Sequence, residues 1–288
     1  MIVTRKNLAR EALDRALEVR EEAKIAFNVP LCVYGLCDQL SVRVQFVDIN
    51  MEGLYLASKR PLIQISSFRP LTRRVFNCGH ELGHHVFGHG STLDELQEER
   101  QATGNSNPKE FLVNAFAGFL LMPPNAVRRA FADRKWNAAQ STPDQCFRIA
   151  CSFGVGYETL VSHLAHSLRM ISVEKASQLQ KVKLPTIRRI MLSHGEAARL
   201  VAIDEHHLLP TVDVEVGTHV LLPQGSDPEQ AALEFVVDLP SGRLFKAMRP
   251  GLVRVEAHGG SWAILVRISR YQYVGWSQYR HLEEIDGE

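Results

Sequence analysis

The segment His80-Glu81-Leu82-Gly83-His84 has the residue types, and the spacing, of a metal-dependent hydrolase. Two histidines four residues apart on a helix lie on the same face, so both imidazoles can reach one ion. Zinc accepts neutral nitrogen ligands and is commonly four-coordinate in such sites. Glu81 follows the first histidine and therefore points beside the ion. There its carboxylate can take a proton from a zinc-activated water and later deliver it to a leaving amine. The motif predicts zinc-dependent hydrolysis of a peptide bond.

An ordinary helix that carries two histidines by chance would show the same motif. The neighbouring residues Leu82, Gly83, Val86 and Phe87 make this helix strongly apolar, so the two histidines are expected to be more than solvated surface residues. Buried imidazoles without partners are costly, and a single metal ion supplies a partner for both of them. The surroundings of the motif therefore favour a metal site.

The third protein ligand distinguishes the classes of zinc peptidase. A metzincin requires a glycine three residues after the motif and a histidine three residues further on, but this chain has Phe87 and Gly90, so that class is excluded. The alternative is a glutamate on a following helix, and Glu110 begins such a helix. Glu110 would also be favoured at this position without a metal, because the helix dipole stabilises acidic side chains in the first turn. The competing carboxylates are Asp94, Glu95, Glu98 and Glu99.

Residues around the motif are candidates for supporting roles. Asn114 lies four residues after Glu110, on the same helix face, and is expected to hold a ligand imidazole by its second nitrogen. His85 and His89 form a second pair on another face, which we interpret as cleft residues or contacts of the ligands rather than as another metal site. The oxyanion of the reaction also needs a hydrogen-bond donor, and the sequence does not choose among Tyr55, Arg73, Arg74 and His85.

The elements that must position these residues follow from hydrophobic periodicity. Helices are predicted over residues 8–23, 71–87 and 108–122. Alternating apolar and polar residues predict strands at 41–49, 53–57 and 61–65, and the polar stretch 91–107 predicts a loop with a short helix. Residues 125–190 are typical of short helices. Strands are expected again at 211–216, 219–222, 233–239, 244–248, 252–257 and 261–268.

Composition limits the compartment and the partners. The 288 residues carry 33 basic and 32 acidic side chains, and this near balance predicts no strong affinity of the whole chain for nucleic acid or membranes. No apolar segment near Met1 resembles a secretion signal, and no window approaches the roughly 18 apolar residues of a membrane span. The five cysteines form no C-x-x-C motif and are predicted to be free thiols. Together these features predict a cytoplasmic protein.

Two segments together resemble the ImmA/IrrE family of bacterial metallopeptidases: residues 73–85 (R-R-V-F-N-C-G-H-E-L-G-H-H) and residues 110–123 (E-F-L-V-N-A-F-A-G-F-L-L-M-P). That family typically has R-x-F before an H-E-L-G-H helix, and a second helix with an A-N-x-F-A-x-x-L-L-M-P run. Val113 replaces the usual alanine and Asn77 the usual threonine, and neither is a proposed ligand. The resemblance covers residues 1–130 well.

The resemblance implies a gluzincin-like site, in which His80, His84 and Glu110 bind zinc and Glu81 is the catalytic base. Manganese is the alternative metal in vivo. It also implies the substrate, because members of this family cleave helix-turn-helix repressors of the XRE type at a specific site and so derepress stress genes. For this chain, cleavage would switch on a response to radiation and DNA damage.

The resemblance further implies an α+β multidomain protein. Residues 1–128 would form a zincin-like metallopeptidase domain and residues 129–187 a helix-turn-helix-like helical domain. The strand-rich residues 188–288 are not general to the family and are similar to the GAF-like α/β sensor domain of its radiation-response members. Such a domain could bind an unidentified small-molecule signal, and its aromatic residues could line a pocket or fill a core: Trp262, Trp276, Tyr271, Tyr273 and Tyr279.

A different class of function is a DNA-binding regulator whose metal site is not catalytic. Residues 125–190 contain eleven Lys or Arg and four Asp or Glu, a net charge of +7, which favours contacts with phosphates. The expected recognition helix, residues 157–168, however, contains no Lys or Arg before Arg169. A helical module that packs on the peptidase or docks its substrate is therefore the favoured interpretation, and DNA binding stays an alternative.

Overall fold

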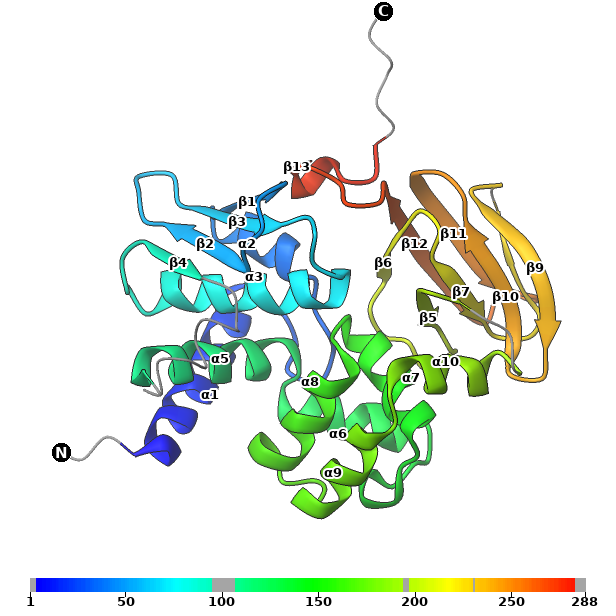
Figure 1. Ribbon diagram of the computed structural model, residues 1–288, viewed down its shortest axis with the longest axis horizontal. Helices are drawn as coiled ribbons and strands as arrows, with labels where there is room; N and C mark the ends of the chain where they lie inside the picture. The colour runs from blue at the N-terminus through cyan, green and yellow to red at the C-terminus, as the bar shows by residue number, and fades with distance from the viewer. Residues whose placement is uncertain (1–3, 95–106, 194–196, 230, 283–288) are drawn as a thin grey trace, which may run out of the picture. The chain divides into compact units, whose positions relative to one another are not determined.

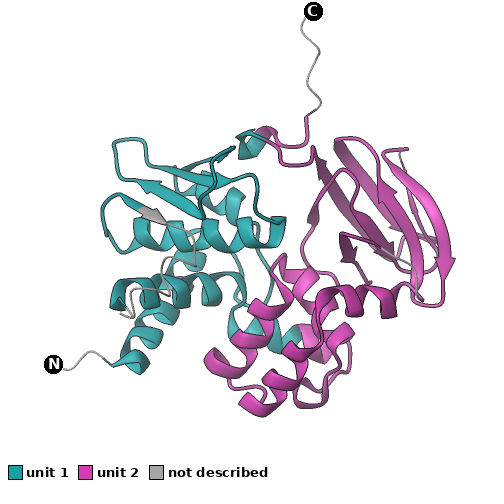
Figure 2. Cartoon of the chain, in the orientation of Figure 1, with its two compact units in different colours: residues 1–129, 274–278 teal, residues 130–273, 279–288 magenta. Residues whose placement is uncertain are grey.

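The computed structural model describes residues 4–94, 107–193, 197–229 and 231–282 (Figure 1). The chain is a mixture of helices and strands and divides into two compact units (Figure 2). The first consists of residues 1–129 and 274–278, and the second of residues 130–273 and 279–288. Among the described residues, no helix is both long enough and apolar enough to cross a membrane. The boundary that we predicted between residues 187 and 188 falls inside the second unit and stays a prediction.

A five-stranded sheet forms one layer of the first unit, with the strand order β13-β1-β3-β2-β4. β1 and β3 are parallel, and the other neighbours are antiparallel. The predicted strands before residue 70 are confirmed. The prediction of a loop at 91–107 is wrong for residues 92–94, which form an edge strand beside β2. The strands are β1 Arg43–Val47, β2 Gly53–Leu56, β3 Leu62–Ser66, β4 Thr92–Asp94 and β13 Gly275–Trp276.

Helices of the first unit stack beneath this sheet, as Figure 1 shows. α3 packs on β2 and β3 and also on α5, and α5 in turn packs on α1. The three long helices confirm the predicted ones, and a short helix, α2, follows Pro30. Their bounds are α1 Arg5–Glu22, α2 Val33–Gln39, α3 Leu71–Val86 and α5 Pro108–Leu121.

Two glycines let α3 and α5 approach each other closely. A Cβ atom added at Gly79 would lie 3.4 Å from the Cβ of Ala117, and one added at Gly83 would lie 3.0 Å from the Cβ of Val113. A side chain at Gly83 would push the helices apart, since a Cβ contact of 3.0 Å is tighter than packed interiors tolerate, and at Gly79 an added Cβ would already be in van der Waals contact. The two glycines therefore let α5, which carries Glu110, lie next to the histidines of α3.

In the helical part of the second unit, α7 and α8 are joined by a short turn. α7 ends at Gly154, whose φ of 65° is the left-handed conformation that glycine adopts without strain. α8 follows and continues as a π-helix, His163–Ser167, so the helix expected over 157–168 is formed with an irregular second half. The helices are α6 Pro124–Asp133, which spans the boundary of the two units, α7 Pro143–Phe153, α8 Tyr157–Ser162, α9 Val173–Lys181 and α10 Leu184–Met191, with a 3₁₀ turn at Ala138–Gln140.

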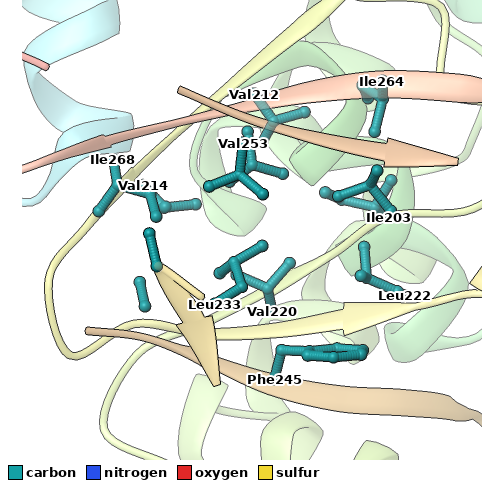
Figure 3. Packing of buried hydrophobic residues seen from close by; sticks show 14 residues of the cluster. Ile203, Val212, Val214, Val220, Leu222, Leu233, Phe245, Val253, Ile264 and Ile268 are labelled. Carbon is teal, nitrogen blue, oxygen red and sulfur yellow. The ribbon is translucent and has the colours of Figure 1, made fainter. Parts of the chain in front are cut away.

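Two four-stranded sheets make up the strand-rich part of the second unit, in the orders β5-β7-β10-β9 and β6-β12-β11-β8. Their apolar residues share one core, in which Val220 and Phe245 of the first sheet meet Val212 and Val253 of the second (Figure 3). The strands are β5 Leu200–Ala202, β6 Thr211–Glu215, β7 His219–Leu222, β8 Ser226–Pro228, β9 Leu233–Leu239, β10 Gly242–Ala247, β11 Gly251–Ala257 and β12 Ala263–Ser269.

This double sheet differs from the α/β domain expected for residues 188–288. Among the described residues from 200 to 282, the helical structure is a single 3₁₀ turn, Ser277–Tyr279, and the two sheets share one core. The predicted strands themselves are confirmed within one or two residues. The GAF-like assignment, with its helical layer, is not confirmed, because alternation along a strand shows that one face is buried but not what covers it.

A buried histidine sits in the loop after β5. His207 is 8% exposed, and in the described part of the chain neither of its ring nitrogens has a hydrogen-bond partner. Burial lowers its pKa to about 4, with smaller opposing effects of Asp204, which raises the pKa, and Arg134, which lowers it. Those two residues are joined by a double hydrogen bond of 2.7 and 2.8 Å. The imidazole is therefore neutral in the folded protein at neutral pH.

We expect the stability of the second unit to fall in mild acid because of His207. An unfolded histidine titrates near pH 6.5, so between pH 6.5 and 4 the unfolded chain binds more protons, and the free energy of unfolding falls as the pH drops. The expected loss between pH 7 and 4.5 is roughly 2 kcal/mol. Urea unfolding at both pH values should show this loss in the wild type and a correspondingly smaller one in His207→Leu. Equal losses in the two proteins would contradict the assignment.

Candidate metal centre

His80 and His84 lie one turn apart on α3 with their imidazoles facing each other. The two Nε2 atoms are 3.2 Å apart, and the side chains are 4% and 1% exposed. Both residues face α5 rather than the sheet, since the glycines one residue before each of them, Gly79 and Gly83, lie against that helix. The same-face arrangement that the spacing predicted is therefore formed.

Glu110 in the first turn of α5 completes a group of three donors. Its two carboxylate oxygens lie 3.4 Å from Nε2 of His80 and 3.5 Å from Nε2 of His84. The donor atoms of the three residues lie within 4.8 Å of one another, and they form the candidate metal-binding group among the described residues. Of the competing carboxylates, Glu95, Glu98 and Glu99 lie outside the described residues, and Asp94 ends β4.

The chemistry and the spacing of these donors fit zinc. Two nitrogens bound at 2.0–2.1 Å in a tetrahedral site lie about 3.3 to 3.4 Å apart. The separation of the two nitrogens observed here, 3.2 Å, is close to such an edge length, and each nitrogen has one oxygen of Glu110 at a similar distance, 3.4 or 3.5 Å. Two imidazoles with one carboxylate are also a donor set that zinc prefers. The group can therefore hold a divalent cation without rearrangement of α3 or α5.

Each imidazole is held by its other ring nitrogen. Nδ1 of His80 lies 3.0 Å from the side-chain oxygen of Asn114, which is the contact expected from the sequence. Nδ1 of His84 lies 3.1 Å from Nδ1 of His89. Such contacts fix the orientation and the tautomer of a ligand histidine. The sequence indicated that His89 lies near the cleft or the ligands, but it did not show which residue it would touch.

Glu81 is fully buried, on the side of α3 that faces the sheet. The hydroxyl of Thr92 on β4 donates to its Oε2 over 3.2 Å. On the other side the carboxylate rests against Gly53 of β2, where an added Cβ would lie 2.5 Å from Oε1. Neighbouring strands of the sheet therefore hold this carboxylate in one place. Neither contact could be found from sequence, because the first depends on the edge pairing of β4 with β2 and the second on the packing of α3 on β2.

The four candidate oxyanion donors have different surroundings. Arg73 makes a double hydrogen bond of 2.7 and 2.8 Å with Glu52, and the guanidinium of buried Arg74 donates to backbone carbonyls. The Tyr55 hydroxyl lies 2.7 Å from Nδ1 of His85. Burial raises the pKa of Tyr55 and lowers the pKa of His85, which favours the neutral forms of both. The guanidinium groups of both arginines are engaged in these hydrogen bonds, so Tyr55 and His85 are the better candidates for the oxyanion donor.

The cysteines are free thiols, as the sequence predicted, and two of them meet between α2 and α3. All five cysteines are free, and three of them are buried. The Sγ atoms of Cys37 and Cys78 lie 3.8 Å apart, and burial raises the pKa of Cys78 well above its usual value. These groups therefore act as small apolar side chains in the packing of α2 on α3.

The geometry of this centre agrees with a comparison to known protein families. Residues 37–164 match the family model Peptidase_M78, the IrrE N-terminal-like domain. This M78 domain runs from α2 to the π-helix after α8 and includes both histidines, Glu81, Glu110 and Asn114. The match supports a metallopeptidase-like function of the ImmA/IrrE kind for this part of the chain. No curated protein matches the chain.

Proposed function

We propose that the chain is a zinc-dependent endopeptidase in which His80, His84 and Glu110 bind the ion and Glu81 is the general base. The convergence of the three donor side chains within 4.8 Å carries the proposal, and the M78 match agrees with it. Manganese is the alternative metal in vivo. Metal analysis of protein purified without added metal tests the choice, and about one zinc per chain is expected.

Bound at this group, zinc would polarise the scissile carbonyl and lower the pKa of the attacking water. The residues of the chain supply the rest of the chemistry. Glu81 takes the proton of the attacking water, and the same carboxyl group then delivers it to the leaving amine. Thr92 and Gly53 keep that carboxylate in one orientation throughout, so no reorganisation is needed between the two proton transfers.

We propose that His85 donates the hydrogen bond to the oxyanion, and that Tyr55 holds the His85 ring in place. The 2.7 Å contact engages Nδ1 of His85, so a neutral ring that accepts there carries its proton on Nε2, free to donate. His85 lies one residue after a proposed ligand and four after the proposed base, and it is half-buried rather than enclosed. A donor of this kind stabilises the negative charge that develops on the carbonyl oxygen.

Removal of the Tyr55 hydroxyl should slow the reaction without loss of metal. We expect Tyr55→Phe to lower kcat up to about tenfold, because a neutral hydrogen bond contributes about 0.5–1.5 kcal/mol. Zinc content should be unchanged, since the hydrogen bond of Tyr55 is with His85, which is not one of the three donors. Initial rates of substrate cleavage and metal analysis measure the two effects. An unchanged kcat would show that the Tyr55 hydroxyl has no role in the reaction.

We propose that the substrate is a helix-turn-helix transcriptional repressor of the XRE type, and that its cleavage derepresses genes of a radiation and DNA-damage response. Support comes from the match to the IrrE N-terminal-like domain and from the helices α7 and α8, which are joined by a short turn and could dock such a protein. By this proposal the chain functions as the radiation-response regulator IrrE does. Incubation of zinc-loaded protein with candidate repressors, followed by mass mapping, should yield two fragments. An intact repressor under these conditions contradicts the substrate proposal.

A DNA-binding regulator is the second candidate, and the net charge of +7 on residues 125–190 favours it. The side chains of α8 and the π-helix argue against base reading. Tyr157 and Leu160 are buried, and the exposed positions are Glu158, His166 and Ser167. These offer no arginine or lysine to base edges. A salt-sensitive gel shift of operator DNA by this protein would favour the DNA-binding regulator instead.

A further inference from the structure

The two proposed ligand histidines are held in the same way but by different partners. In each, Nε2 faces the other donors of the centre and Nδ1 faces away from it. For His80 the partner is the side-chain oxygen of Asn114, which can only accept a hydrogen bond. The proton of His80 is therefore on Nδ1, and Nε2 keeps the lone pair that a metal requires.

Another histidine, His89, holds His84 in the same tautomer. Its Nδ1 lies 3.1 Å from Nδ1 of His89, and the two rings meet edge to face at 66°. Only one proton fits between two nitrogens, so one of them donates and the other accepts. For His84 to present a lone pair at Nε2, it must donate from Nδ1, and His89 must accept.

The chain after α3 is built to bring His89 to this position. Gly88 and Gly90 have φ values of 65° and 80°, in the left-handed region that glycine adopts without strain. The backbone N–H of His89 donates to the carbonyl of His84 over 3.0 Å. Its ring also stacks on Phe87, with centroids 5.9 Å apart and planes inclined by 21°. The turn therefore directs the imidazole back to the helix.

We propose that His89 is the positioning residue of the ligand His84, and that it fixes the tautomer with the lone pair on Nε2 by accepting a hydrogen bond at its own Nδ1. The inference rests on the proposed metal-binding function. Contacts of this kind with ligand histidines typically change metal affinity by 10–100-fold when they are removed. His89 itself is a half-buried residue on the far side of the ring, so it acts through His84 and not on the ion.

Two substitutions separate the hydrogen bond from the packing. His89→Phe keeps an aromatic ring to stack on Phe87 but removes the acceptor. His89→Asn removes the ring but places an oxygen where Nδ1 was, as Asn114 does for His80. We expect zinc affinity, measured by competition with a chromogenic chelator, to fall about 10–100-fold in the phenylalanine variant and to stay within a few-fold of wild type in the asparagine variant.

The controls distinguish failure of this inference from failure of the proposed function. His166→Phe, an exposed histidine of the π-helix, should bind zinc as the wild type does. If the wild type itself binds no zinc, the proposed function is wrong. If the wild type binds zinc and His89→Phe binds it equally well, or His89→Asn is as weak as His89→Phe, only the role of His89 is wrong. Should phenylalanine destabilise the turn, alanine at position 89 makes the same comparison with asparagine.

Discussion

The Glu81→Gln protein is expected to bind zinc and fold as the wild type does, and to cleave its substrate at least about 10²–10⁴-fold more slowly. The amide has nearly the shape of the carboxylate, so it can keep its place against Gly53 and still accept the hydrogen bond from Thr92. It cannot accept the proton of the attacking water at neutral pH. The change therefore removes the base and leaves the three metal donors untouched.

Two further variants show whether the loss belongs to the base. His84→Ala should lose metal and cleavage together, because it removes one of the three converging donors. Glu21→Gln, at an exposed position of α1, should behave as the wild type in every measurement. Zinc content, far-UV circular dichroism and the rate of repressor cleavage are measured on all of them. A Glu81→Gln protein that cleaves at the wild-type rate, or that fully complements a null strain, would contradict regulation by proteolysis.

The metal-binding group could be predicted from the sequence because it depends mainly on local geometry. The four-residue spacing of His80 and His84 on a helix already fixes their common face. Placing Glu110 beside them required more, namely that two helices separated by a polar stretch pack closely. The exclusion of the metzincin pattern and the family resemblance pointed to Glu110, and in the structure Gly79 and Gly83 allow the close packing. The contact of Asn114 follows from the same helix pairing.

Contacts that depend on the pairing of strands, the packing of sheets or the geometry of a turn could not be predicted from the sequence. β4 has three residues, which is too short for periodicity to reveal, yet its Thr92 holds Glu81. β13, near the end of the chain, pairs with β1, although nothing in its composition indicates that sheet. In the second unit the strands were predictable by alternation, but the covering of one sheet by another was not. The turn that returns His89 to His84 depends on two φ angles rather than on a residue pattern.

The Gly53→Ala protein is expected to keep its metal and lose about 10²-fold of its activity, because the new methyl group displaces the base. An added Cβ would lie 2.5 Å from Oε1 of Glu81 and 2.9 Å from its Cγ. The side chain of Glu81 is the flexible partner in this contact, so its carboxylate moves away while the strand stays in place. A displacement of about 1 Å in a catalytic group can cost 10²-fold in rate.

A control at a glycine where an added Cβ makes only ordinary contacts tests whether the loss comes from the contact with Glu81. A Cβ at Gly35 on α2 meets its nearest atom, the Cβ of Cys32, at 3.9 Å, so Gly35→Ala should cleave as the wild type does. Zinc affinity should be equal in both variants, since the atoms nearest to the new methyl groups belong to Glu81 and Cys32 and not to His80, His84 or Glu110. A strong fall in kcat with unchanged zinc affinity, confined to Gly53→Ala, is the expected pattern. A wild-type kcat in Gly53→Ala would show that the rate does not depend on the position of the Glu81 carboxylate. That result would contradict the assignment of Glu81 as the base.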